Sequence, residues 1–318
     1  MIADDPRWDA ELLGLLRARP EEAPAPSLDA QRRAADAAGA AENAGGPAMA
    51  GTRDRWVLAR GRRVLVRVHR PRTDAALPAL VFLHGGGWVF GSLDTHDRLM
   101  RELAAAGDMA VVGVDYALSP EAPFPRAAEE CAAVLARVAA EASSWGLDPA
   151  RLVLGGDSAG GNLAFATALL LRDGGADPEV AAAWRALRGV LAIYPVCDAA
   201  MADASYREFA TGYGLDATDM AWFWERYVPD AGARGSPLAS VVRAPLAGLP
   251  PVLIQAAELD VLRGEGEAMA ARLREAGVEV RHAVSPGAPH GFLAHMAGTA
   301  RAREALALAG EWLRARCR

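Results

Sequence analysis

The chain has 318 residues, which is enough for one large domain or two small ones. Hydrophobic residues make up 52%, charged residues 23%, and the mean hydropathy is +0.07, a composition that excludes a disordered or collagen-like protein. The 34 basic and 40 acidic residues give a net charge of −6, so we expect no basic face for nucleic acid.

The sequence contains no lysine, so every basic residue is an arginine. This excludes lysine Schiff bases, Walker A phosphate binding and Ser-x-x-Lys hydrolases. The three cysteines, Cys131, Cys197 and Cys317, are far apart and odd in number, which favours neither a disulfide framework nor a zinc site. We therefore expect no metal and a reducing compartment.

The first twenty residues are acidic where a signal peptide would be basic, with Asp4, Asp5, Asp9 and Glu11 among them. No apolar run approaches the ~18 residues of a membrane span. The sequence therefore predicts a cytoplasmic protein without a membrane partner.

Residues 1–52 are predicted to form a separate N-terminal segment with two helices, at 5–19 and 28–38. Further along the chain, short apolar runs alternate with helical stretches. The expected strands are 56–58, 64–68, 79–83, 109–114, 152–154, 189–194, 252–257 and 278–284. The expected helices are 94–106, 126–142, 159–172, 264–276 and 299–316. This alternation predicts an α/β fold with a mostly parallel, eight-stranded sheet flanked by helices.

One stretch breaks the alternation, because helical patterns occupy residues 199–234 where the next strand is expected. Together with residues 1–52, this insertion is predicted to form a helical cap over the carboxyl edge of the sheet. The remaining residues from 53 to 318 then make up the main domain.

The strongest chemical signal is Gly156-Asp157-Ser158-Ala159-Gly160, which fits the pattern G-x-S-x-G. An apolar strand leads into it and an Ala/Leu-rich helix leads out. A serine between glycines on such a strand–turn–helix is typical of a nucleophile elbow, which exposes the hydroxyl at the sheet edge. The alternative is a glycine-rich turn of structural use only.

A second signal, His84-Gly85-Gly86-Gly87, directly follows an expected strand. Three consecutive glycines are costly in conformational entropy unless bare backbone is needed. Backbone N–H groups of Gly85 and Gly86, together with that of Ala159, are predicted to form an oxyanion hole. The alternative is a flexible hinge.

A serine nucleophile needs a base, and the base needs an orienting acid. His290 lies in a loop after the last expected strand, and Asp260 directly follows the strand before it. The chain order Ser158, Asp260, His290 is typical of α/β-hydrolases. Glu258 is the rival acid, and Asp198 and Asp203 rank below it.

These motifs resemble those of the hormone-sensitive-lipase-like branch of the α/β-hydrolases, the bacterial family IV esterases. The resemblance extends through Asp115-Tyr116-Ala117-Leu118-Ser119-Pro120-Glu121, Ala257-Glu258-Leu259-Asp260 and His290-Gly291-Phe292, and covers residues 55–318. It implies a triad of Ser158, Asp260 and His290, an oxyanion hole from Gly85, Gly86 and Ala159, and a helical cap.

The sequence departs from the family pattern in two places. The family often has Asp-Pro-Leu-Arg-Asp-Glu-Gly after the acid, where this chain has Asp260-Val261-Leu262-Arg263-Gly264-Glu265-Gly266. The loss of the proline and one acid is expected to loosen that loop. The family also often has an aromatic residue shortly before the histidine, where this chain has Ser285-Pro286-Gly287.

The predicted function is a carboxylesterase that cleaves small to medium acyl esters and needs no cofactor. Trp88, Tyr213 and Trp222 are candidates for the substrate pocket, although such aromatic residues also serve as the core of a cap. An amidase or deacylase with the same triad remains an alternative, as do a long-chain lipase and a non-catalytic small-molecule-binding protein. The family resemblance also raises the expectation of a homodimer.

Overall fold

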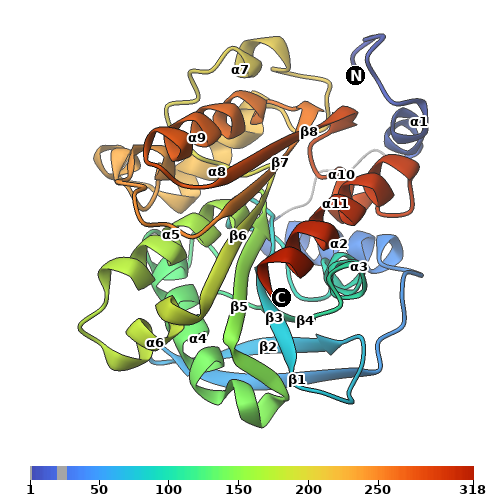
Figure 1. Ribbon diagram of the computed structural model, residues 1–318. Helices are drawn as coiled ribbons and strands as arrows, with labels where there is room; N and C mark the ends of the chain where they lie inside the picture. The colour runs from blue at the N-terminus through green and yellow to red at the C-terminus, as the bar shows by residue number, and fades with distance from the viewer. Residues whose placement is uncertain (1, 20–26) are drawn as a thin grey trace.

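The computed structural model describes residues 2–19 and 27–318, so Met1 and residues 20–26 of the expected N-terminal segment lie outside the described part. Eight strands form one sheet in the order β1-β2-β4-β3-β5-β6-β7-β8. β1 pairs antiparallel with β2 and β2 with β4, whereas all other neighbours are parallel. The predicted α/β fold with a mostly parallel, eight-stranded sheet is confirmed (Figure 1).

The strands lie where the apolar runs predict them, although several are longer. Their bounds are β1 Gly51–Ala59, β2 Arg62–Arg70, β3 Leu77–Leu83, β4 Ala110–Val114, β5 Leu147–Asp157, β6 Leu187–Ile193, β7 Val252–Leu259 and β8 Val280–Pro289. Every residue of β3 and β4 is buried. Such uniform burial explains their continuous apolar sequence, because a central parallel strand is covered on both faces.

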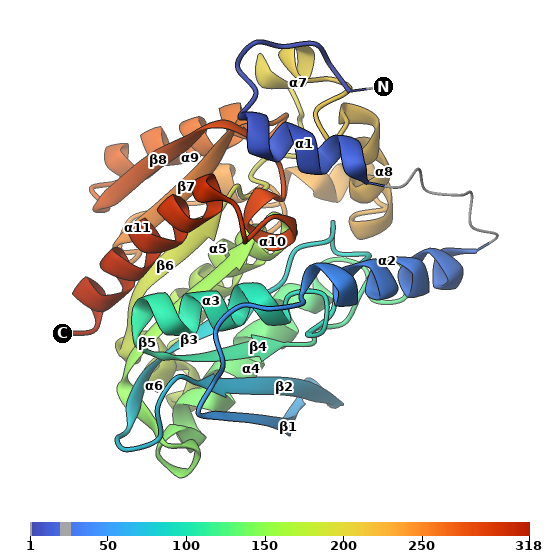
Figure 2. The same cartoon turned by 90° about the vertical axis from the view of Figure 1, so that its right-hand side faces the viewer.

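Helices cover both faces of the sheet (Figures 1 and 2). α3 (Asp97–Gly107) and α11 (Ala300–Arg316) pack against each other on one face. The other face is covered by α4 (Arg126–Glu141), α5 (Ala159–Asp173), α6 (Pro178–Ala186) and α9 (Arg263–Glu275). Two hydrophobic clusters, one on each side, form the core of the protein.

The N-terminal segment forms two helices, α1 (Ala10–Ala18) and α2 (Leu28–Glu42). α1 is shorter than the expected helix 5–19 because the Asp9 side chain accepts hydrogen bonds from the N–H groups of Glu11 and Leu12 and so begins the helix. α2 lies beside α3 (Figure 2). Arg32 of α2 donates to the carbonyl oxygens of Val89 and Ser119, at 2.9 and 2.7 Å.

The insertion at 199–234 contains two α-helices, α7 (Ser205–Glu208) and α8 (Ala217–Tyr227), with a 3-10 turn at Ala231–Gly235. α1, α7 and α8 lie at the same end of the molecule (Figure 2). Tyr213 joins the two segments, because its ring stacks on Trp8 at 5.6 Å and its hydroxyl donates to Asp5 at 2.9 Å. The short α10 (Phe292–His295) and 3-10 turns at Ala142–Trp145 and Val241–Arg243 complete the described elements.

Candidate active site

Ser158 occupies the sharp turn between β5 and α5. Its backbone has φ 55° and ψ −120°, a strained conformation that a non-glycine residue rarely adopts. A Cβ at Gly160 would overlap the carbonyl oxygens of Leu83 and His84, so this position has room only for glycine. The local sequence therefore forms the predicted strand–turn–helix, with the serine at its apex.

The three predicted triad residues meet in space. Ser158 Oγ lies 2.9 Å from His290 Nε2, and His290 Nδ1 lies 2.7 Å from Asp260 Oδ2. Asp260 is buried and its other oxygen accepts the N–H of Leu262 at 2.9 Å. Because the carboxylate can only accept, Nδ1 carries the proton and Nε2 is free to accept the serine proton.

Asp260 and His290 come from neighbouring strand ends. Asp260 directly follows β7 and His290 directly follows β8, and these two strands are parallel neighbours. The ring of Tyr194, whose φ is +34°, lies 4.7 Å from the imidazole of His290 between ring centroids. Tyr194 limits the movement of that imidazole, and no motif in the sequence indicates this contact.

The rival acids have other partners. Glu258 Oε2 accepts the N–H of Gly287 at 2.7 Å. Asp198 pairs with Arg243 at 3.1 Å. Burial, followed by repulsion from Asp198, raises the pKa of Asp203. Of the four candidate acids, only Asp260 is placed against His290.

The glycine loop follows β3, as predicted, but its amides differ in their partners. The N–H of Gly85 donates to Asp157 Oδ1 at 2.8 Å, which differs from the expectation that it points at an oxyanion. Within the described residues, the N–H groups of Gly86 and Gly87 have no hydrogen-bond partner. Ala159 is the first residue of α5, where helical geometry supplies no acceptor for the N–H.

Aromatic side chains surround the glycine loop. Trp88 is fully buried and stacks on Tyr227 of α8 at 4.1 Å. Trp222 stacks on Phe90 at 5.9 Å and lies under the guanidinium of Arg226. A Cβ at Gly87 would overlap the ring of Phe223, so α8 rests directly on the glycine loop. The sequence prediction chose Trp222 for the pocket, because periodicity alone does not indicate which residue of the aromatic run at 222–224 makes this contact.

A buried carboxyl group joins the insertion to the loop of the catalytic acid. Glu265 of α9 accepts hydrogen bonds from the Tyr206 hydroxyl at 2.6 Å, from the N–H of Asp198 at 2.9 Å and from the N–H of Cys197. Burial outweighs these hydrogen bonds and raises the pKa of Glu265 to about 8. The hydroxyl of Ser205, the residue before Tyr206, donates to the carbonyl oxygen of Val261 at 2.6 Å. These contacts hold the loop that the departure from the family pattern was expected to loosen.

The described residues contain no group of three or more His, Cys, Asp or Glu side chains that could hold a metal ion. No described helix is both long and apolar enough to cross a membrane.

Comparison with known proteins agrees with this geometry. A family model described as alpha/beta hydrolase fold matches residues 80–294. The carboxylic ester hydrolase LipN of Mycobacterium tuberculosis is 40% identical over 238 residues, which are 71% of this chain and 60% of LipN. The ethyl acetate hydrolase of Pseudomonas putida is 38% identical over 73% of this chain and 72% of that protein.

Among solved structures, a thermostable esterase from Pseudomonas putida ECU1011 superposes with a TM-score of 0.90 at 34% identity, over 99% of both chains. The chain belongs to the α/β-hydrolase family and, within it, to the carboxylic ester hydrolases. This agrees with the resemblance to the hormone-sensitive-lipase-like branch.

Proposed function

We propose that this chain hydrolyses carboxylic esters with small to medium acyl groups through an acyl-enzyme on Ser158. The observation that carries the proposal is the hydrogen-bonded series from Ser158 Oγ through the His290 imidazole to Asp260. The similarity to an ethyl acetate hydrolase supports the small acyl group.

In the proposed reaction, His290 Nε2 takes the proton of Ser158 as Oγ attacks the ester carbonyl. Asp260 holds the imidazole in the required tautomer and stabilises the imidazolium that forms. His290 then protonates the leaving alkoxide, and the alcohol departs. A water molecule, deprotonated by the same nitrogen, attacks the acyl-enzyme and releases the carboxylic acid and the free serine.

The negative charge on the tetrahedral intermediate needs donors that are not already occupied. We assign this role to the N–H groups of Gly86, Gly87 and Ala159. Gly87 thus replaces Gly85, which the sequence predicted as the third donor. The hydrogen bond between the Gly85 N–H and Asp157 is the reason for this change.

We also propose that the N-terminal segment 1–52 and the insertion 199–234 form a cap that shapes the substrate pocket. Phe223 is half-buried and contacts the glycine loop more directly than Trp222 does, so we assign the wall of the pocket to Phe223. Trp88 is fully buried against Tyr227, which favours a role in the core beneath the pocket. Tyr213 packs against Trp8, which favours a role in the core of the cap. The cytoplasmic location and the homodimer stay predictions.

A chain-length series of p-nitrophenyl esters from acetate to laurate tests the proposed function, with matched amides as a second series. We expect the highest kcat/KM between two and eight acyl carbons and a much lower rate on the amides. Ser158→Ala should abolish turnover, whereas Ser240→Ala serves as a matched control outside the triad. Wild-type activity in the Ser158→Ala variant would disprove the assignment, and preference for amides would identify an amidase.

A further inference from the structure

Asp157, the residue before the nucleophile, lies against the first glycine of the glycine loop. β3 and β5 are parallel neighbours in which Leu83 is paired with Gly156. The residues that follow this pair are therefore side by side, and the Asp157 carboxylate reaches the N–H of Gly85 at 2.8 Å. A Cβ at Gly85 would collide with this carboxylate, so the first glycine of the loop is required by the aspartate.

His96 lies against both the Gly85 amide and the Asp157 carboxylate. His96 Nε2 lies 3.3 Å from the Gly85 nitrogen and 3.4 Å from Asp157 Oδ1. The hydroxyl of Thr95 donates its single proton to the carbonyl oxygen of Ser92, so His96 Nδ1, at 2.9 Å, donates to Thr95 Oγ1. Thr95 thus fixes the orientation of the His96 ring, so that Nε2 faces the Asp157 carboxylate.

His96 and Asp157 are fully enclosed, with exposed fractions of 4% and 3%. Although burial by itself raises the pKa of Asp157, attraction to His96 lowers it overall, so the carboxylate is ionised and acts only as an acceptor. A charged acceptor forms the stronger type of hydrogen bond with a backbone N–H. The Gly85 amide is therefore held by the Asp157 carboxylate and is already occupied as a donor.

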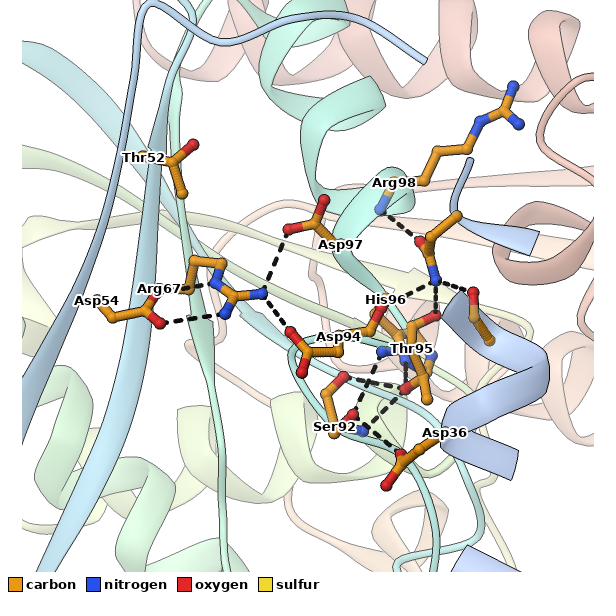
Figure 3. Close-up of polar contacts among 12 residues, drawn as sticks. Asp36, Thr52, Asp54, Arg67, Ser92, Asp94, Thr95, His96, Asp97 and Arg98 are labelled. Atoms are coloured by element: carbon orange, nitrogen blue, oxygen red, sulfur yellow. Dashed lines mark hydrogen bonds and ion pairs between the residues drawn. The ribbon is translucent and has the colours of Figure 1, made fainter. Parts of the chain in front are cut away.

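The turn that carries His96 is itself braced from two sides (Figure 3). On one side, Arg67 of β2 pairs with Asp94 at 2.7 Å. On the other side, Asn43 donates to the carbonyl oxygens of Asp94 and Thr95, both at 2.9 Å, and accepts the N–H of Arg98 at 2.6 Å. These contacts give His96 a fixed position relative to the sheet.

From these contacts we infer that Asp157 is a positioning residue that anchors the glycine loop through Gly85, so that the next amides, Gly86 and Gly87, face the oxyanion. His96 is the second arm of this anchor. The inference rests on the proposed ester hydrolysis and extends it, because it assigns a role to the variable position of the G-x-S-x-G motif. A loop held at its first amide has its following amides oriented before substrate arrives, which is the condition for electrostatic stabilisation of the intermediate.

The first test uses the wild-type protein, labelled with ¹⁵N-glycine, and a trifluoromethyl ketone, which adds to a catalytic serine and forms a stable oxyanion. We expect the Gly85 amide to exchange slowly with and without the ketone. The Gly86 amide should exchange fast in the free enzyme and at least tenfold more slowly in the adduct. Protection of Gly85 that appears only in the adduct would overturn the inference.

The second test compares Asp157→Ala with Asp157→Asn, which keeps an acceptor for Gly85. Asp157→Ala should lower kcat at least tenfold, with KM changed less than threefold. The affinity for the ketone should fall by the same factor as kcat. Its Gly85 amide should exchange at least tenfold faster. Asp157→Asn should stay within about threefold of the wild type in all three measurements. Wild-type kcat in Asp157→Ala, or equal damage in both variants, would overturn the inference.

These outcomes are separate from those of the proposed function. If the wild type neither hydrolyses esters nor binds the ketone, the proposed function fails, whatever the exchange rate of Gly85. If the wild type is active and Ser158→Ala is not, while Asp157→Ala is unchanged, only the anchoring role fails.

Discussion

Glu258 and Gly287 are joined by a 2.7 Å hydrogen bond from the glycine N–H to the carboxylate. Gly287 lies three residues before His290, and its carbonyl oxygen accepts the N–H of Asp9 from the N-terminal segment at 3.1 Å. Two acids that are two residues apart thus have different tasks. Asp260 orients the imidazole, and Glu258 holds the end of β8 that carries it.

A pair of matched substitutions separates these tasks. Asp260→Asn should lower kcat at least about 10³-fold, because the amide favours the wrong tautomer of His290. Glu258→Gln keeps an oxygen that accepts the Gly287 N–H, so kcat should stay within about fivefold of the wild type. Steady-state kinetics on p-nitrophenyl butyrate measures both. A larger loss in Glu258→Gln than in Asp260→Asn would reverse the assignment of the acid.

The order of the strands, the elbow and the triad could be predicted because each depends on a local signal. Ser158 lies between a strand and a helix, and Asp260 and His290 each follow a strand. Since parallel strands bring their carboxyl ends to one edge, three local signals predict one site. Helix α6 also had a local signal, Asp177 as N-cap before Pro178, but it is absent from the sequence prediction.

The partner of Gly85 could not be predicted in this way. Asp157 is 72 residues away from Gly85, and their contact depends on the register between β3 and β5. The contact between Phe223 and Gly87 depends on how α8 packs over the sheet edge. Neither relationship has a period or a motif, so only the folded chain shows them.

Phe223 provides a test of the pocket wall. Phe223→Ala removes a ring from above Gly87, and a longer acyl chain can fill that space. Each buried methylene contributes about 0.8 kcal/mol, so the ratio of kcat/KM for octanoate to that for acetate should rise at least about fivefold. Trp222→Ala, in which the lost ring stacks on Phe90, should leave the ratio near its wild-type value. The reverse result would assign the wall to Trp222.

Glu265 should make stability depend on pH. Its pKa is raised from 4.5 in the unfolded chain to about 8 in the fold, mainly by burial. Both states are protonated below pH 4.5, so the full contribution is present there. As the pH rises towards 8, only the unfolded chain ionises, and the free energy of unfolding falls by up to about 1.4 kcal/mol per pH unit.

Glu265→Gln removes this ionisation while keeping an acceptor for the N–H groups of Cys197 and Asp198. The free energy of unfolding, measured with urea at pH 5.0, 6.5 and 8.0, should therefore fall less with pH in the variant than in the wild type. Glu267→Gln, a substitution at an exposed site on the same helix, should follow the wild type. If the free energy of unfolding changed with pH by the same amount in all three proteins, the raised pKa of Glu265 would be contradicted.

Gly264 stands where the family pattern often has aspartate, and the structure explains why restoring that residue should harm this chain. A Cβ at Gly264 would lie 2.7 Å from the Cβ of Asp203 and 3.0 Å from Ser205 Oγ. An aspartate in the first turn of α9 would gain from the helix dipole, by about 0.3–1 kcal/mol. Overpacking costs about 1–3 kcal/mol, and the new carboxylate would also face Asp203, so the cost is larger than the gain.

Gly264→Asp should therefore lower the free energy of unfolding by about 1–3 kcal/mol in urea titrations. Gly175→Asp is the matched control, because no atom lies within 4 Å of a Cβ there, and it should change stability by less than about 0.5 kcal/mol. Adding Asp203→Ala to Gly264→Asp removes the facing carboxylate and should recover part of the loss. A Gly264→Asp variant that is more stable than the wild type would contradict this explanation. It would show that the close approach of Asp203 does not exclude an aspartate from position 264.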